Sequence, residues 1–285
     1  MKTPKRIQPL IEDGIVDEVL RPLMSGKEAS VYVVRCGDEI RCAKVYKEAA
    51  QRSFKQAVLY QEGRKVRNSR RARAMEKGSK FGRKQQEDAW HNAEVDALYR
   101  LAKAGVRVPK PYGCFDGVLL MELVTDEEGG VAPRLNDVSM SAEQAIEDHA
   151  LVMHYVKLML VAGLVHGDLS EFNVLVDEYG PVIIDLPQAV DAAGNNNARS
   201  MLGRDINNMT EYYGQYAPEL LATRYADEMW ALYEDGELNE DTPLSGEFEY
   251  SGEAADVDAV LLEIKAVMEE EAERRERIRE ANEED

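Results

Sequence analysis

The sequence predicts an α+β fold of two lobes, in which a small lobe of antiparallel strands with one long helix precedes a larger, mostly helical lobe. Residues 23–34 read as a strand, a tight turn and a second strand, and residues 41–46 alternate in polarity as a further strand. Apolar residues then recur at helical spacing over residues 83–104. A chain of 285 residues is long enough to bury the cores of both lobes.

The second half of the chain is predicted to contain a hairpin and two helices. Two short apolar runs, at residues 174–176 and 182–184, flank the turn-forming segment Asp-Glu-Tyr-Gly-Pro, which predicts an antiparallel hairpin. Helical spacing predicts one helix over residues 201–213 and another from Pro218 to about residue 233, with the proline in its first turn. Residues 235–251, rich in glycine and acidic residues, are expected to form a connector.

The composition is that of a soluble globular protein, with 44% hydrophobic and 31% charged residues. No apolar run approaches the ~18 residues of a membrane span, and no apolar stretch follows the basic start of the chain. We therefore expect no membrane contact, no signal peptide and a cytoplasmic location. The three cysteines lack metal-site spacing, and Cys36 and Cys42 fit small core residues in a reducing compartment.

One segment carries most of the chemical information. Residues 166–173 read His-Gly-Asp-Leu-Ser-Glu-Phe-Asn, and Asp185 ends the second apolar run of the hairpin. The hairpin should fold Asn173 back towards Asp185, where an amide oxygen and a carboxylate make a site for Mg²⁺, or for Mn²⁺, with room for phosphate oxygens. Asp168 is then free to accept the proton of an attacking hydroxyl. Each residue alone is more often a turn or cap residue, but together their order and spacing fit phosphoryl transfer as protein kinases perform it.

The upstream half contains the residues that would handle the phosphates. Ser25, Gly26 and Lys27 lie in the turn between the first two strands, and the glycine permits close approach of the backbone to a phosphate. Lys44 stands where kinases place the lysine that contacts the α- and β-phosphates. Glu94 lies on the following helix and could pair with Lys44, although taken alone it reads as one more solvated carboxylate.

The turn Ser-Gly-Lys-Glu-Ala-Ser matches neither G-x-G-x-x-G nor a Walker A motif. It resembles the phosphate loop of the RIO family of atypical protein kinases. Residues 166–173, the Ile-Ile-Asp-Leu-Pro-Gln-Ala-Val string at 183–190 and the hinge at 119–124 carry the same resemblance. It runs from about residue 23 to about residue 233 and is closest to the first RIO subfamily, and the compact chain suits a bacterial member.

The resemblance implies a bilobal protein-kinase-like fold that lacks the activation segment and the peptide-binding helices. The Ala-Pro-Glu of residues 217–219 is then a helix start, and Gly167 replaces the arginine on which a phosphorylated activation loop would dock. ATP would lie against the hinge. The implied site residues are Ser25, Gly26 and Lys27 at the phosphates, Lys44 oriented by Glu94, Met121 as gatekeeper, the backbone of Glu122 and Val124 at adenine, Asn173 and Asp185 at Mg²⁺, and Asp168 as base, with Asp185 also catalytic.

These expectations divide the chain into three parts. Residues 1–124 form an amino-terminal lobe with the phosphate turn, a basic insertion at about 48–84 and the Glu94 helix. Residues 125–250 form a carboxy-terminal lobe with the catalytic loop and the metal site, and residues 251–285 form an acidic helix.

The implied activity is that of an ATP-dependent serine/threonine protein kinase, which transfers the γ-phosphoryl group to a protein hydroxyl and autophosphorylates. One alternative is an ATPase-driven conformational switch acting on a ribonucleoprotein through an aspartyl-phosphate at Asp185, because it uses the same residues. Another is a small-molecule phosphotransferase, which the Ser-Gly-Lys-Glu-Ala and Asp-Leu-Pro strings disfavour.

Charge is spread unevenly along a chain whose net charge is −19. Residues 52–84 contain twelve basic and two acidic residues. One interpretation is an electrostatic patch for RNA, a ribosomal particle or an acidic partner, and the other is a solvated loop. In the RIO family this insertion is a flexible loop beside the ATP site where autophosphorylation occurs, which by resemblance suggests Ser69 and Ser79 as phosphorylation sites.

Overall fold

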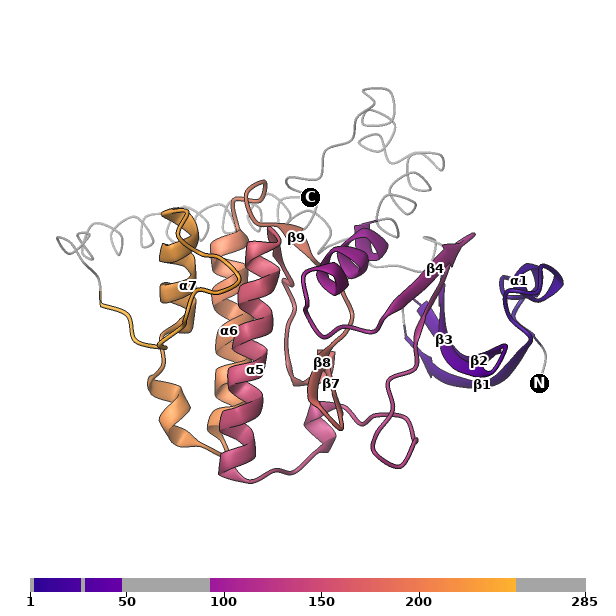
Figure 1. Cartoon of the computed structure of the whole chain (residues 1–285), viewed down its shortest axis with the longest axis horizontal. Helices are drawn as coiled ribbons and strands as arrows, with labels where there is room; N and C mark the ends of the chain where they lie inside the picture. Colours follow the sequence, from indigo (N-terminus) through magenta and orange to yellow (C-terminus); the bar gives the residue numbers. More distant parts are fainter. Residues whose placement is uncertain (1–2, 27–28, 48–92, 250–285) are drawn as a thin grey trace, which may run out of the picture. The chain divides into compact units, whose positions relative to one another are not determined.

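The computed structural model describes residues 3–26, 29–47 and 93–249 (Figure 1). The residues up to Glu247 belong to one compact unit, and those from Phe248 onward belong to a second unit.

Several predictions fall outside the described residues. They concern Lys27, the basic segment at 52–84 with Ser69 and Ser79, and the helix expected at 251–285. These, and the boundaries of the three parts of the chain, stay predictions.

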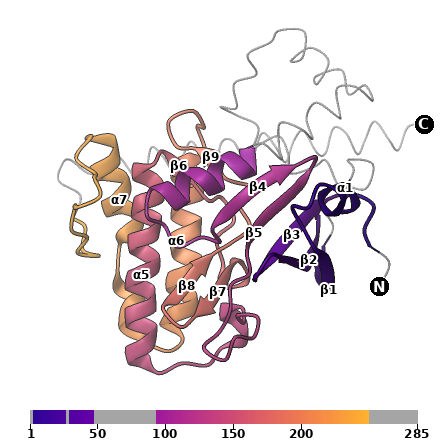
Figure 2. The same cartoon turned by 45° about the vertical axis from the view of Figure 1, so that its right-hand side comes forward.

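The described part before residue 125, here called the small lobe, is built on a five-stranded antiparallel sheet in the order β1-β2-β3-β5-β4 (Figures 1 and 2). The strands expected from residues 23–34 and 41–46 are present as β1, β2 and β3. The elements are α1 (Gln8–Glu12), β1 (Glu18–Ser25), β2 (Ala29–Cys36), β3 (Glu39–Tyr46), β4 (Pro111–Phe115) and β5 (Val118–Glu122).

An apolar cluster anchors the start of the chain to this sheet. Ile7 and Leu10, at α1, pack with Val34 of β2, Ala43 of β3 and Leu120 of β5, all of them buried. In β2 the buried residues alternate with more exposed ones over the first part of the strand, as a half-buried strand requires.

The helix that carries Glu94 is described over residues 93–103, the later part of the range expected from the sequence. Leu98 and Leu101 are buried, as their helical spacing predicted. The helix ends before Gly105, whose φ of +82° is the left-handed conformation that glycine adopts readily after a helix.

The described part from residue 125 to Glu247, here called the large lobe, is mostly helical, which confirms the predicted α+β class and its two lobes. The helices α5, α6 and α7 lie side by side in Figures 1 and 2, and all three contribute buried residues to the main apolar core. None of the described helices is long and apolar enough to span a bilayer. The elements are η3 (Leu135–Asp137), α5 (Ala142–Val161), β6 (Leu164–Val165), η4 (Glu171–Asn173), β7 (Val174–Asp177), β8 (Gly180–Ile183), β9 (Val190–Asp191), α6 (Ala198–Gly214), η5 (Pro218–Ala222) and α7 (Tyr225–Glu234).

The single helix predicted over residues 218–233 is wrong, because η5 and α7 are separate elements. Between them Thr223 is extended, and its Oγ donates to the Leu220 carbonyl at 2.7 Å. The next N–H, that of Arg224, donates to the Gly246 carbonyl at 2.7 Å instead of continuing a helix. A tertiary hydrogen bond therefore interrupts an apolar pattern that is helical on both sides of the break.

The connector predicted at residues 235–251 has no regular structure over its described part, but it is fastened to the helices by two buried charges. Lys157 of α5 is 5% exposed and Glu228 of α7 is 9% exposed. Burial of such groups requires hydrogen-bonded partners, which this segment supplies. The bonds run from Lys157 Nζ to the carbonyls of Glu240 and Thr242, and from the N–H groups of Ser245 and Gly246 to Glu228.

Candidate active site

Three charged side chains from separate elements meet at one point. The Nζ of Lys44, on β3, lies 2.5 Å from Oε1 of Glu94 and 3.0 Å from Oδ1 of Asp185, which follows β8. The side chains of Lys44 and Glu94 are 12% and 5% exposed, whereas that of Asp185 is 49% exposed. The small-lobe pair is therefore shielded from water, and the large-lobe carboxylate is open to a ligand.

The charges of this cluster stabilise one another. Burial acts to lower the pKa of Lys44, but the two carboxylates outweigh it and hold that pKa above its usual value. Burial likewise acts to raise the pKa of Asp185, and the Lys44 ammonium outweighs this and lowers it. Tyr46 donates its hydroxyl to the second oxygen of Glu94 at 2.7 Å. At neutral pH the site therefore presents an ammonium beside an ionised carboxylate.

Asp185 has a backbone conformation that few residues adopt. Its φ is +66°, in the left-handed region, which aspartate tolerates better than most residues. The preceding residue is bonded on both sides, since the Ile184 N–H donates to the Asn173 carbonyl at 3.0 Å and the Ile184 carbonyl lies 3.1 Å from Nε2 of His166. The buried His166 thus supports the turn that carries Asp185.

A bond within the catalytic loop orients the side chain of Asn173. Its Nδ2 donates to the Asp168 carbonyl at 2.8 Å, which leaves the amide oxygen for another partner. The Asn173 amide oxygen and the Asp185 carboxylate are hard oxygen donors. Such donors hold Mg²⁺ when phosphate oxygens complete its coordination shell. Among the described residues, no three or more acidic, histidine or cysteine side chains are grouped so that they could hold a metal ion.

The exposed Asp168, expected to accept a proton, is held by a side chain that the sequence did not single out. Gln188 donates from Nε2 to Oδ2 of Asp168 at 3.0 Å. Partial desolvation raises the pKa of Asp168 and the Asp185 charge adds to this, while His166, Arg204 and the Gln188 bond act in the opposite direction. A carboxylate whose pKa is raised is a stronger base once it is ionised.

The catalytic loop rests on α6, which the sequence did not connect with the site. Asp205, 1% exposed, accepts the N–H groups of Gly167 and Leu169 at 2.7 and 2.9 Å. Arg204 and Asn208 donate to the carbonyls of the same two residues, at 2.7 and 2.9 Å respectively. Burial raises the pKa of Asp205 to about 6, although the two amide bonds oppose the shift. The sequence did offer one signal for this role. Asp205 lies on the apolar stripe of a predicted helix, where a buried carboxylate needs a polar partner.

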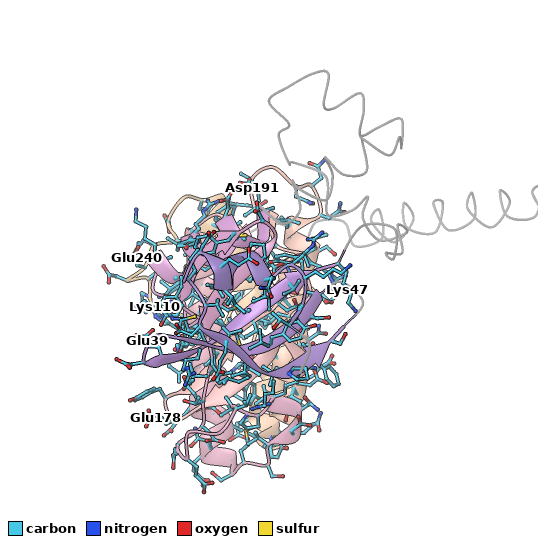
Figure 3. The ribbon with its side chains drawn as sticks, turned by 90° about the vertical axis from the view of Figure 1, so that its right-hand side faces the viewer. Glu39, Lys47, Lys110, Glu178, Asp191 and Glu240 are labelled. Atoms are coloured by element: carbon cyan, nitrogen blue, oxygen red, sulfur yellow. The ribbon has the colours of Figure 1, made fainter. Side chains whose placement is uncertain are left out.

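The phosphate turn is described at Ser25 and Gly26 and is closed by Lys47, which Figure 3 labels. The Nζ of Lys47 donates to the Gly26 carbonyl at 2.6 Å and lies 3.2 Å from Oγ of Ser25. A Cβ on Gly26 would meet the Ala29 carbonyl oxygen at 3.7 Å, an ordinary contact. The described atoms around Gly26 therefore leave room for a Cβ at this position.

The hinge residues Met121, Glu122 and Val124 lie at and after the end of β5. The Glu122 N–H donates to the Lys110 carbonyl at 2.9 Å, and the Val124 carbonyl accepts the Ala132 N–H at 3.0 Å. The Glu122 N–H and the Val124 carbonyl are therefore engaged within the protein.

Comparison with known proteins identifies the family. A family model described as the RIO domain matches residues 30–226. This chain belongs to the RIO family. The RIO-type serine/threonine-protein kinase Rio1 of Haloferax volcanii is 36% identical to this RIO protein over 210 residues, which cover 73% of this chain and 67% of that protein.

Longer relatives match a similar share of the chain. The serine/threonine-protein kinase RIO1 of Chaetomium thermophilum is 31% identical over 229 residues, and that of Homo sapiens is 29% identical over 217 residues. Each alignment covers 75% of this RIO protein but 43% and 36% of the relative, so the chain spans less than half of these two proteins. A match to the crystal structure of a kinase domain covers 77% of this chain and 67% of the chain in that structure. With a TM-score of 0.42 and 14% identity, this likeness is too weak to add to the family assignment.

Proposed function

We propose that this RIO protein is an ATP-dependent serine/threonine protein kinase, which transfers the γ-phosphoryl group of ATP to a protein hydroxyl and autophosphorylates. The proposal rests on the contacts of Lys44 with Glu94 and Asp185. In the adjoining loop, the side chain of Asn173 is bonded to the Asp168 carbonyl. Phosphoryl transfer needs a cation for the phosphates, a metal site and a base, and these residues supply all three. The names of the relatives support the same activity.

Each residue has one task in the proposed reaction. Asp168 accepts the proton of the attacking hydroxyl. Asn173 and Asp185 would hold Mg²⁺, which when bound neutralises charge on the phosphates. Lys44 exchanges its contact with Asp185 for the α- and β-phosphates, while Glu94 keeps the ammonium in place.

The nucleotide would be held at both ends. Ser25, Gly26 and Lys27 cover the phosphates, and the adenine edge meets the Glu122 carbonyl as acceptor and the Val124 N–H as donor, with Met121 bordering the base. The Lys110 and Ala132 bonds of the hinge support this choice of groups, since they occupy the Glu122 N–H and the Val124 carbonyl.

The acceptor hydroxyl would reach Asp168 without passing an activation segment. Residues 186–197, between Asp185 and α6, contain β9 and no helix. Because Gly167 offers no cation to a phosphorylated loop, activity should not require prior phosphorylation.

An ATPase-driven switch is the second candidate, and the state of Asp185 favours it. Lys44 contacts Oδ1 of Asp185, the side chain is half exposed, and its pKa is lowered by the Lys44 ammonium against the effect of burial. An ionised, accessible carboxylate could attack the γ-phosphorus and form an aspartyl-phosphate, with ADP as the leaving group and water completing the cycle.

Incubation with γ-labelled ATP and Mg²⁺, with and without a generic protein acceptor, tests both candidates. Label that survives acid but not strong base indicates phosphoserine or phosphothreonine, whereas label released by hydroxylamine indicates an aspartyl-phosphate. Absence of label and of phosphate release would contradict both.

The basic segment at 52–84 supports a proposal about partners. Its excess of positive charge on an acidic protein should attract RNA or a ribosomal particle with an affinity that falls steeply as salt rises. Reversing Arg70, Arg71, Arg73 and Lys77 to Glu should abolish salt-sensitive RNA binding and preserve ATP binding. Equal RNA binding by this variant and the wild type would rule out a nucleic-acid contact here.

A further inference from the structure

Arg107 joins the adenine hinge to the hairpin that leads to Asp185. Its guanidinium lies 2.8 and 2.9 Å from the two carboxylate oxygens of Glu122, at the end of β5. The same group lies 2.7 and 3.1 Å from Oδ2 of Asp177, at the end of β7. One side chain therefore holds a hinge residue and the first strand of the hairpin.

The backbone around Arg107 makes the same connection a second time. The Arg107 carbonyl accepts the N–H of Ile183, the last residue of β8, at 2.9 Å. Lys110 accepts the Glu122 N–H with its carbonyl and donates its own N–H to the Glu122 carboxylate, both at 2.9 Å. The segment 107–110 thus contacts the hinge residue and both strands of the hairpin.

These bonds are shielded enough to matter energetically. The side chains of Asp177, Arg107 and Glu122 are 5%, 27% and 28% exposed. Burial acts to raise the pKa of Glu122, and the Arg107 bonds and charge outweigh it and lower it. A need to neutralise the buried Asp177 explains an arginine at this position, but it does not explain why the arginine also clamps the residue at the proposed adenine edge.

We infer that Arg107 is a positioning residue that sets the alignment of the adenine site with the metal site. The inference rests on the proposed function. A nucleotide is one ligand with two ends, and its phosphates reach the metal site at an effective concentration that depends on how well the two sites are aligned. A loss of alignment should therefore weaken the joint binding of the two ends more than the binding of either end alone.

The test measures how much Mg²⁺ strengthens ADP binding, by titration calorimetry with and without Mg²⁺, with adenosine as a ligand for the hinge alone. The main variant is Arg107→Gln combined with Asp177→Asn, because the second change removes the carboxylate that would otherwise be buried without a partner. Arg107→Lys, which keeps the charge but lacks the planar fork, is the conservative variant. The matched control is Arg35→Gln, in the exposed pair between Arg35 and Glu18.

In the double variant the factor by which Mg²⁺ strengthens ADP binding should fall by at least ~5-fold. Its affinity for adenosine should change by less than about twofold. Arg107→Lys should lie between the double variant and the wild type, and Arg35→Gln should match the wild type. An enhancement equal to that of the wild type in both Arg107 variants would overturn the inference and leave the proposed function intact. Wild-type protein without Mg²⁺-dependent ADP binding would instead refute the proposed function, and the inference with it.

Discussion

The two lobes differ in the polar side chains that they bury. In the described small lobe the buried charged residue is Glu94, and the cluster containing Ile7, Val34 and Leu120 is apolar. The described large lobe buries a larger set of polar and charged side chains: Asp148, His149, Lys157, His166, Asn195, Asp205, Thr210 and Glu228.

The partners of these groups show what the difference means. Glu94 is paired with the side chains of Lys44 and Tyr46. Asp205 and Glu228 accept backbone N–H groups, and Lys157 donates to backbone carbonyls. A bond to the backbone fixes a loop, whereas a contact between side chains can be exchanged for one to a ligand. Asp205, Glu228 and Lys157 therefore hold the framework of the large lobe, whereas the buried charge of the small lobe is proposed to serve the chemistry.

The largest expected effect belongs to an exposed carboxylate of the large lobe. Asp168→Asn removes the proposed proton acceptor without removing a buried bond, so kcat for phosphoryl transfer should fall at least ~10²-fold with little change in thermal stability. Asp235→Asn, an exposed aspartate at the end of α7, is the matched control. An Asp168→Asn protein as active as the wild type would exclude the role as base.

A buried histidine of the large lobe should affect stability and its pH dependence instead. Burial lowers the pKa of His149 from 6.5 to about 4, and its Nε2 lies 3.0 Å from Thr210 Oγ. Between these two values the unfolded chain binds a proton that the folded chain does not, so the stability that the neutral ring contributes is lost as pH falls through this window. Through His149, the free energy of unfolding should fall by about 2 kcal/mol as the pH is lowered from 7 to 5.

Denaturant titrations at a series of pH values check this expectation. His149→Gln should make the stability depend less on pH than it does in the wild type. The raised pKa of Asp205 has the opposite effect on stability, but it is common to both proteins and cancels when they are compared. His154→Gln, at a more exposed histidine, serves as the control. Parallel curves for wild type and His149→Gln would show that the ring does not titrate in this way.

The pair in the small lobe should show a kinetic effect of intermediate size. Glu94→Gln keeps the shape of the side chain but removes the charge that holds Lys44, so kcat/KM for ATP should fall about tenfold, equivalent to ~1.4 kcal/mol. Glu39→Gln, which breaks the exposed pair with Arg41, should leave the kinetics unchanged. Unaltered kinetics in Glu94→Gln would mean that Lys44 needs no partner for its position.

The smallest expected effect tests the fastening of the connector. The hydroxyl of Ser245 lies 2.8 Å from Oε1 of Glu228, in addition to the backbone bonds at that carboxylate. Ser245→Ala should lower the unfolding free energy by about 1 kcal/mol and leave the kinetics unchanged. The exposed Ser139→Ala provides the baseline for the same substitution. If Ser245→Ala altered KM for ATP, the separation between framework and chemistry would fail.

Short-range patterns in the sequence were sufficient for the catalytic hairpin and for most of the elements around it. A hairpin is a contiguous structure, so its turn and its two apolar runs bring Asn173 and Asp185 to one end without help from the rest of the chain. Lys44 and Glu94 were recognisable because they stand at motif positions on a strand and a helix. The predicted helix over residues 218–233 was wrong because the residue that interrupts it bonds to Gly246, which periodicity cannot reveal.

The tertiary structure alone decided which residues support the site. Gln188, Asp205 and Arg107 find their partners 15 to 70 positions away in the chain. A single glutamine or arginine belongs to no local pattern, and the place of Asp205 on the apolar stripe of a predicted helix indicated a need for a polar partner without indicating which one. Their roles arise only where folding shields them from water and brings hydrogen-bonding partners within reach, because an unpaired polar group is then costly. The sequence by itself therefore predicted which groups react, and the distant contacts of the folded chain determined what holds them in place.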